Sequence, residues 1–306
     1  MKVPLGKIAR SLWSFWDNGR KVERTAYLMG TLLLVSGLLH LVILTVGGGT
    51  WMGPLSLRKP TTFGLSFGLT LMTIAWVSSF LRLGARVRVI LLSLFTIACA
   101  IETALVSLQA WRGVPSHYNV ETTFDGLVAR TLAAGGVALV VISAVLTLAA
   151  LRANPTISAG LRIAIRAGFI ALCSAVSVGA LMIAKGMLLV FAGNPQAAYV
   201  TGGTLKPTHA VTMHAILVLP LLAWLLSFTA WNERRQLEVV LLATAGYAAF
   251  AGVVAVVNSA GLDLSQAPSA AITIGGGGLL ALAAAWVIAL VGVARSPAGA
   301  PRQTNA

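Results

Sequence analysis

The chain has few charged residues for its length, and acidic residues are the scarcest. Only 10% of its 306 residues are charged, 8 of them acidic, whereas 58% are hydrophobic. So few polar side chains cannot cover the surface of a water-soluble core. This composition excludes an ordinary soluble domain and makes the lipid bilayer the expected partner.

The apolar runs show no two-residue alternation, which favours membrane-spanning helices over strands. Runs of about 20 apolar residues, the length that crosses a bilayer as a helix, occur eight times. The predicted spans are 24–46, 63–81, 89–111, 127–149, 167–192, 209–231, 237–258 and 271–294. We therefore predict an all-α polytopic transmembrane bundle of about eight spans, forming a single domain over residues 24–294.

Compact cofactor and redox motifs are missing. The two cysteines, Cys99 and Cys173, both lie in predicted spans, and the sequence contains no CxxC, CxxCH or HExxH. A P-loop, or a GxGxxG after a strand, is also missing, which disfavours nucleotide chemistry.

Basic residues outnumber acidic ones, 22 to 8, and they collect in short loops between spans. If the N-terminus is cytoplasmic, 16 of the 22 lie on the cytoplasmic side. This bias predicts cytoplasmic N- and C-termini in a bacterial cytoplasmic membrane, and no nucleic-acid partner is expected.

The two tails differ in composition. Residues 1–23 mix cations with Leu, Trp and Phe and are predicted to be a basic amphipathic cytoplasmic tail. Within it, residues 8–16 fit either a short helix on the membrane surface or a frayed tail. Residues 295–306 are predicted to be a disordered cytoplasmic tail.

Eight spans divide evenly into four and four, but the halves do not match in motif. The sequence therefore predicts no inverted-repeat transporter.

Four ionisable residues are predicted to occupy one layer in the outer half of the bundle. At about 1.5 Å of rise per residue, His40, Glu102, Lys185 and His214 each lie roughly 9 to 14 Å below the outer surface. An ionisable group at that depth costs about 3 kcal/mol unless it is paired or hydrated. We expect these side chains to face inward, with Glu102 and Lys185 as partners.

A polar stripe continues from this layer to the outer loops. Gln109 lies seven residues after Glu102, on the same helix face, and leads to Arg112 and a loop that contains His117 and Asn119. Lys59 and Asp125 lie at the outer ends of the second and fourth predicted spans.

Each of these features also has a purely structural explanation. Glu102 with Lys185 could be an ion pair that fixes helix register, and His40 could be a hydrogen-bonded core residue. His209 could cap its span, and the loop around His117 could be a turn. His209 and His214, five residues apart, lie about 140° apart around a helix and do not converge on one metal without distortion.

A combination of motifs resembles a group of functionally uncharacterised bacterial integral membrane proteins. The matching residues are Arg58, Lys59 and Pro60; Glu102, Gln109, Arg112 and Gly113; Ser116, His117, Tyr118 and Asn119; Gly203 and Leu205; and His209, His214, Leu219 and Pro220. Tyr118 replaces the Phe that the pattern expects. The resemblance covers roughly residues 58–220 and implies a shared outer site without identifying its substrate.

Three classes of function remain open, besides an accessory subunit that docks a partner. The first is a protein that binds haem or a transition metal, with metal ligands among His40, His209 and His214. Its cofactor site would comprise His40, His214, Gln109, Arg112, His117, Asn119 and Lys59. The second is an enzyme acting on a membrane-soluble lipid or isoprenoid, as terpene cyclases do.

The catalytic candidates of that enzyme are Glu102 as general acid, Asp125 and Lys185. The third class is a small-solute transporter with a cationic path through Lys59, Arg112 and Lys185.

Overall fold

The computed structural model describes residues 5–53, 55–199 and 203–296, and in these ranges it is all-helical. In chain order the helices are α1 (Leu5–Asp17), α2 (Lys21–Val46), α3 (Arg58–Ser78), α4 (Ala85–Trp111), α5 (Thr123–Leu151), α6 (Ala159–Phe191), α7 (Pro195–Ala198), α8 (Lys206–Leu226), α9 (Glu233–Ser259), the short 3-10 helix η1 (Leu264–Gln266) and α10 (Ser269–Arg295).

Eight of these helices are long and apolar enough to cross a membrane: α2 to α6 without a break, then α8, α9 and α10. The chain is therefore a multi-pass membrane protein, and the prediction of eight spans is confirmed. Several predicted boundaries are wrong. The span expected over 63–81 is α3, which begins at Arg58 and ends at Ser78, and the span expected over 167–192 is α6, which begins at Ala159. The span expected over 209–231 begins earlier and ends at Leu226, because the following residues turn through short i to i−3 backbone hydrogen bonds.

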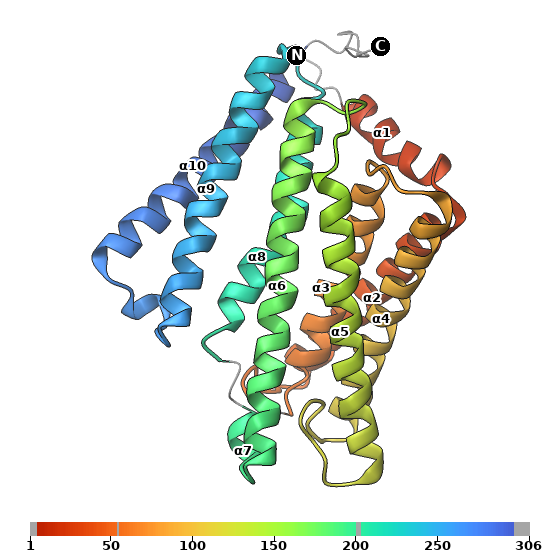
Figure 1. Cartoon of the computed structure of the whole chain (residues 1–306), viewed down its shortest axis with the longest axis vertical. Coiled ribbons are helices and arrows are strands. Elements are labelled where there is room, and N and C mark those ends of the chain that lie inside the picture. Colours follow the sequence, from red (N-terminus) through yellow and green to blue (C-terminus); the bar gives the residue numbers. More distant parts are fainter. Residues whose placement is uncertain (1–4, 54, 200–202, 297–306) are drawn as a thin grey trace.

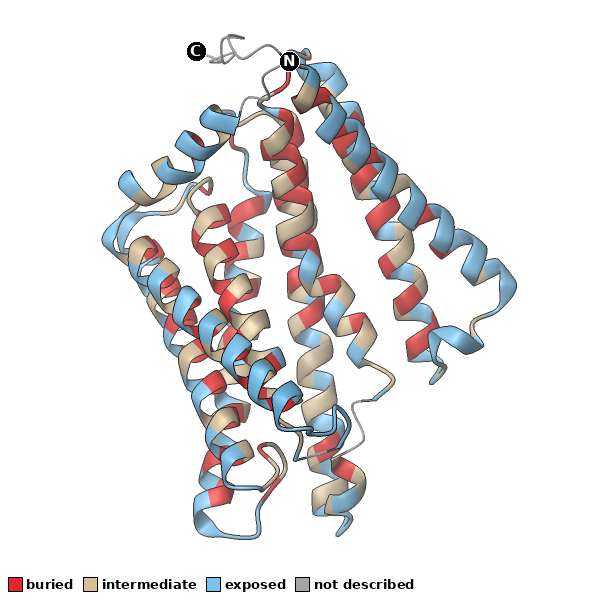
Figure 2. Cartoon of the chain, turned by 180° about the vertical axis from the view of Figure 1, so that it is seen from behind, coloured by how far each residue is buried: buried red, intermediate tan, exposed pale blue. Residues whose placement is uncertain are grey.

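Figure 1 shows that the long helices run between two ends of the bundle. We call the end that carries α1 and the last turns of α10 the proximal end, and the end that carries α7 the distal end. Figure 2 shows exposed residues along the outward faces of the long helices. Many are large and apolar, among them Leu188 and Leu280, which are 68% and 72% exposed. Such side chains are suited to contact lipid. The cytoplasmic location of both termini stays a prediction.

The two halves of the chain repeat one arrangement. Helices α3 and α8 each have 21 residues and begin at residues 58 and 206, which are 148 positions apart. Helices α4 and α9 each have 27 residues and begin at 85 and 233, again 148 positions apart. Packing repeats as well, because α2 packs on α3 and α4 as α6 packs on α8 and α9.

Matching motifs mark the ends of α3 and α8. Near its start each helix has Lys-Pro-Thr, at residues 59–61 and 206–208. At its end each has Trp-x-x-Ser-Phe, at residues 76–80 and 224–228. The serine of each end motif donates its hydroxyl hydrogen to the carbonyl of the motif's tryptophan over 2.6 Å.

The expectation that the halves do not match is therefore wrong. The chain is two four-span units, α2 to α5 and α6 to α10. Their shared motifs are short and lie only at helix ends, so the divergent apolar residues between them conceal the repeat. Because each unit crosses the membrane an even number of times, the two units run parallel and not inverted.

Equivalent residues of the two units meet at the proximal end. The rings of Trp76 and Trp224 lie 6.2 Å apart and nearly perpendicular. Phe15 of α1 inserts beside them, 5.9 Å from Trp76 and 6.4 Å from Trp224, and Phe80 and Phe228 complete the group. We call these five residues the proximal aromatic cluster.

Helix α1 is formed, so for residues 5–17 the helical alternative holds rather than the frayed tail. Its Phe15 faces the bundle, whereas Leu5, Leu12 and Trp13 on another face are more than half exposed. The guanidinium of Arg24 fixes its end by donating to the carbonyls of Trp16 and Asp17. Its place on a membrane surface stays a prediction, and the predicted disordered tail from residue 297 onward lies outside the described residues.

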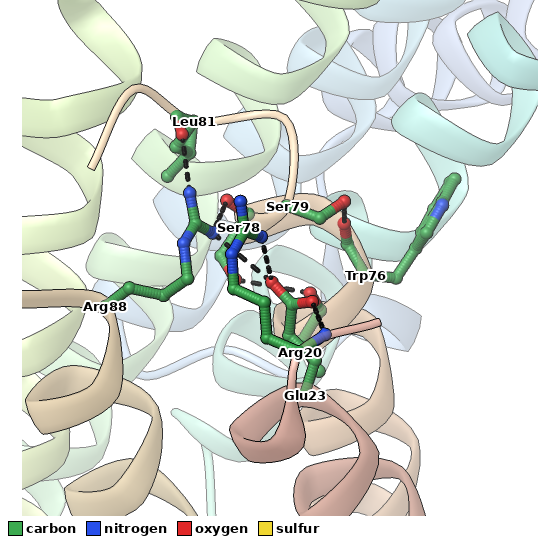
Figure 3. Close-up of polar contacts among 8 residues, drawn as sticks. Arg20, Glu23, Trp76, Ser78, Ser79, Leu81 and Arg88 are labelled. Atoms are coloured by element: carbon green, nitrogen blue, oxygen red, sulfur yellow. Dashed lines mark hydrogen bonds and ion pairs between the residues drawn. The ribbon is translucent and has the colours of Figure 1, made fainter. Parts of the chain in front are cut away.

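A buried polar network joins α2, α3 and α4 at the proximal end (Figure 3). Arg88 donates to the carbonyls of Ser78 and Leu81 over 2.6 and 2.9 Å, which satisfies the last turn of α3. Glu23 lies 3.5 Å from Arg88 and 2.9 Å from Arg20. Arg88 is one of the basic residues that the sequence predicts to lie on the cytoplasmic side between spans, yet it belongs to α4 and is 3% exposed.

The backbones of α2 and α3 approach closely through glycines. A Cβ at Gly64 would lie 2.6 Å from the Cα and N of Gly37. We therefore expect Gly64→Ala to destabilise the bundle by about 1 to 3 kcal/mol, because the helices must separate. The measurement is the thermal unfolding temperature of detergent-purified protein. Gly252→Ala is the matched control, since nothing lies within 4 Å of its added Cβ; equal stability of the two variants would contradict the prediction.

Candidate functional site at the distal end

The α4–α5 connection, residues 112–122, is tied to the start of α5 through Asp125. This carboxylate accepts hydrogen bonds from Gln109 at 2.9 Å, from Arg112 at 2.5 Å and from the Thr122 hydroxyl at 2.7 Å. The Asp125 N–H in turn donates to the Thr122 hydroxyl, which caps the helix. The predicted stripe of Gln109, Arg112 and Asp125 is thus brought together. Because three donors occupy the carboxylate, this group anchors the loop.

Tyr118 carries the same loop across to α6. Its backbone adopts φ 68°, the left-handed region, and its hydroxyl donates to the carbonyl of Met182 over 3.0 Å. The ring packs against Gly186, where any Cβ would overlap it. Burial raises the pKa of Tyr118 to about 12. The loop therefore bridges α4, α5 and α6.

His117 lies between this loop and α3. Its Nδ1 is 2.9 Å from the Ser116 hydroxyl, and its ring is 5.8 Å from the ring of Phe63. Burial, together with the nearby positive charge of Lys59, lowers the pKa of His117 to about 3. The imidazole is therefore neutral at physiological pH.

Basic side chains at the starts of α3 and α8 lie near one another, and one of them, Lys59, lies near His117. Lys59 lies within electrostatic range of Arg58, Lys206 and His117. We call Arg58, Lys59 and Lys206 the distal basic cluster. Across the described ranges, none of the three forms an ion pair with a carboxylate. The positive ends of both helix dipoles add to this charge.

Asn119 is another residue of this loop that the sequence predicts to bind a ligand, and its side chain is fully buried. Its Oδ1 accepts from the N–H of Glu121 over 3.1 Å, whereas its Nδ2 has no hydrogen-bond partner. A buried amide donor without an acceptor is rare in a folded protein.

Glu102 and Lys185 do not form the expected ion pair. Glu102 is 4% exposed, its Oε1 has no hydrogen-bond partner, and its carboxyl faces Gly135 of α5. Lys185 lies on an exposed face of α6. The two residues share a depth but point in different directions around their helices.

The histidines predicted as cofactor or metal ligands are engaged elsewhere. The Nδ1 of His40 is 2.8 Å from the carbonyl of Ser36, and its Nε2 accepts from the Trp111 indole N–H over 3.0 Å. His209 contacts the carbonyl of Ala175 on α6, and the exposed His214 contacts the carbonyl of Ala210 on its own helix.

A haem or metal ion would have to displace Trp111 to reach His40. The described part of the chain contains no group of three or more His, Cys, Asp or Glu side chains that could hold a metal ion.

Comparisons with protein-family models, curated proteins and solved structures give no match to this chain. The chemistry of the distal end must therefore be inferred from its own geometry.

Removing the Asp125 carboxylate should release the loop. We expect Asp125→Ala to increase trypsin cleavage after Arg112 several-fold, because it removes the carboxylate that accepts hydrogen bonds from Gln109, Arg112 and the Thr122 hydroxyl. The measurement is the rate of limited proteolysis in detergent. Glu121→Ala, an exposed carboxylate four residues away, is the control that should keep the wild-type rate.

Acid should weaken the docking of His117. The unfolded chain takes up a proton at this residue with pKa 6.5, whereas the folded chain resists protonation until about pH 3. Between pH 6.5 and about pH 3, the unfolded chain therefore binds more protons at this residue than the folded chain does. The part of the free energy of unfolding that this residue contributes above pH 6.5 is lost as the pH falls through this range. We expect His117→Gln to reduce the acid-induced fall in unfolding temperature; an unchanged fall would contradict this.

Proposed function

We propose that this protein is a membrane carrier for small anions, which it binds at its distal end between its two four-span units. The observation that carries the proposal is the distal basic cluster. Its cations come from matching positions of two matching helices and have no carboxylate partner in the described part of the chain.

Electrostatics support an anionic ligand. Like charges held near one another in a partly buried place repel, and the repulsion grows as the surroundings become less polar than water. A bound carboxylate or phosphate group would relieve this repulsion and would also interact with the dipoles of α3 and α8. Neutral His117 beside Lys59 could accept or donate a hydrogen bond without adding charge.

The duplicated architecture supports transport over static binding. Transporters built from parallel repeats bind their substrates at the interface between the repeats. Here the two units meet where α5 packs on α6 and where α3 packs on α8, with the basic cluster at the distal ends of α3 and α8 and the aromatic cluster at their proximal ends. A carrier with this arrangement would take up its anion from the distal side, which the charge bias predicts to be extracytoplasmic.

A second candidate is the intramembrane enzyme acting on a lipid or isoprenoid. The observation that favours it is the buried Glu102 carboxyl, which could serve as a general acid. Asp125, another catalytic candidate of that enzyme, is poorly placed to transfer protons to Glu102 because its oxygens already accept from Gln109, Arg112 and Thr122.

The location in a bacterial cytoplasmic membrane and the relationship to the bacterial membrane proteins that the sequence resembles remain predictions.

Binding of small anions tests the proposal. Phosphate, sulfate and citrate are titrated into detergent-purified protein at constant ionic strength while the unfolding temperature is recorded. We expect at least one to stabilise the wild type, and Lys59→Gln and Lys206→Gln each to weaken its binding by about tenfold, which corresponds to about 1.4 kcal/mol.

Arg86→Gln, which removes an exposed cation at the proximal end, is the matched control and should bind like the wild type. If no anion stabilises the wild type, or if all three variants bind alike, the chain does not use the distal basic cluster for anions.

A further inference from the structure

Glu102 is an isolated carboxyl in the middle of a membrane-spanning helix. It is 4% exposed, and its Oε1 has no hydrogen-bond partner. It lies ten residues before Arg112, roughly 15 Å deeper along α4. A buried carboxylate without a partner is so costly that the group is expected to hold a proton instead.

The elements that pack on α4 do not supply a cation to Glu102. On α4 itself the other titratable or charged groups are Arg86 and Arg88 in its first turn and Cys99, which lies three residues before Glu102. The other titratable or charged residues of α2, α3 and α5 are Lys21, Glu23, Arg24, Tyr27, His40, Arg58, Lys59, Asp125 and Arg130. None of them forms an ion pair with Glu102, and Arg130, the cation nearest to Gly135 along α5, is exposed.

The second unit shows that this place in the fold does not need a carboxyl. The residue 148 positions after Glu102 is Phe250 of α9. Glu102 faces Gly135 of α5, and the backbone of Phe250 lies 2.9 Å from where a Cβ at Gly278 of α10 would be. In the second unit the glycine contacts the backbone of Phe250, and the side chain at the position that corresponds to Glu102 is apolar.

We infer that Glu102 is a proton-binding site inside the membrane, with Gly135 keeping the space that its carboxyl occupies. A structural role would be served by an apolar side chain, such as the phenylalanine at the corresponding position of α9, whereas an unpaired carboxyl lowers stability. Buried polar groups that weaken the fold are characteristic of functional sites. The inference goes beyond anion binding, because Glu102 and the distal basic cluster are separate groups at different depths.

A hydrophobic carbodiimide probes this site because it reacts with protonated carboxyls in apolar surroundings. The carboxyl proton moves to one carbodiimide nitrogen as the carboxyl oxygen bonds to the central carbon and a C=N π bond breaks. The acyl group then moves from that oxygen to nitrogen, giving a stable N-acylurea. No group leaves, so the peptide gains the mass of one reagent molecule.

The experiment treats full-length protein in detergent with dicyclohexylcarbodiimide at several values between about pH 5 and pH 9, a range over which buried carboxyls of proteins release their protons. Peptide mass spectrometry then locates the adduct. We expect one adduct on Glu102 that diminishes as pH rises, and none at that position in Glu102→Gln. The control Glu238→Gln removes an exposed carboxylate paired with Arg234 and should leave labelling of Glu102 unchanged.

Glu102→Met tests the structural alternative. We expect it to fold with an unfolding temperature equal to or above that of the wild type, because it removes an unsatisfied buried group. The inference is overturned if folded wild type gives no adduct on Glu102, if the adduct does not depend on pH, or if Glu102→Met fails to fold. None of these readouts involves anion binding, so this inference and the proposed carrier function can fail separately.

Discussion

The constraint on which this structure depends is the low polarity of the bilayer, which penalises every charge that lacks a partner. Most of the buried ionic groups avoid this penalty by forming ion pairs. Glu23 is held by Arg88 and Arg20 at the proximal end, and Asp125 is held by Arg112 at the distal end. The first group links α2 to α4 and the second links α4 to α5, so the requirement to pair charges also fixes how these helices assemble.

Two groups depart from this rule. The distal basic cluster brings cations together without a carboxylate, and Glu102 places a carboxyl among apolar helices without a cation. A fold selected only for stability would retain neither. The departures are therefore better indications of function than the polar residues that are fully satisfied, such as His40 with its bonds to Ser36 and Trp111.

Hydropathy was sufficient to predict the eight spans, because span length is set by membrane thickness. The stripe from Gln109 to Arg112 was also predictable, since it depends only on helical periodicity along one helix. Partners on different helices were not predictable in this way. Depth placed Glu102 and Lys185 in one layer, but depth gives no information on the rotation of α4 and α6, and Lys185 lies on an exposed face. The burial of Arg88 was not predictable either, because an arginine in a loop and a buried arginine look alike in the sequence.

The contact between Trp76 and Trp224 has a consequence for the origin of the chain. When equivalent residues of parallel units touch each other, the same contact in separate copies would be a self-contact across a twofold axis, as in a symmetric dimer. An ancestor of half the present length could therefore have assembled through this tryptophan before the two copies became one chain. Fusion would have removed the requirement that both copies change together, which allows one half to have a carboxyl where the other has Phe250.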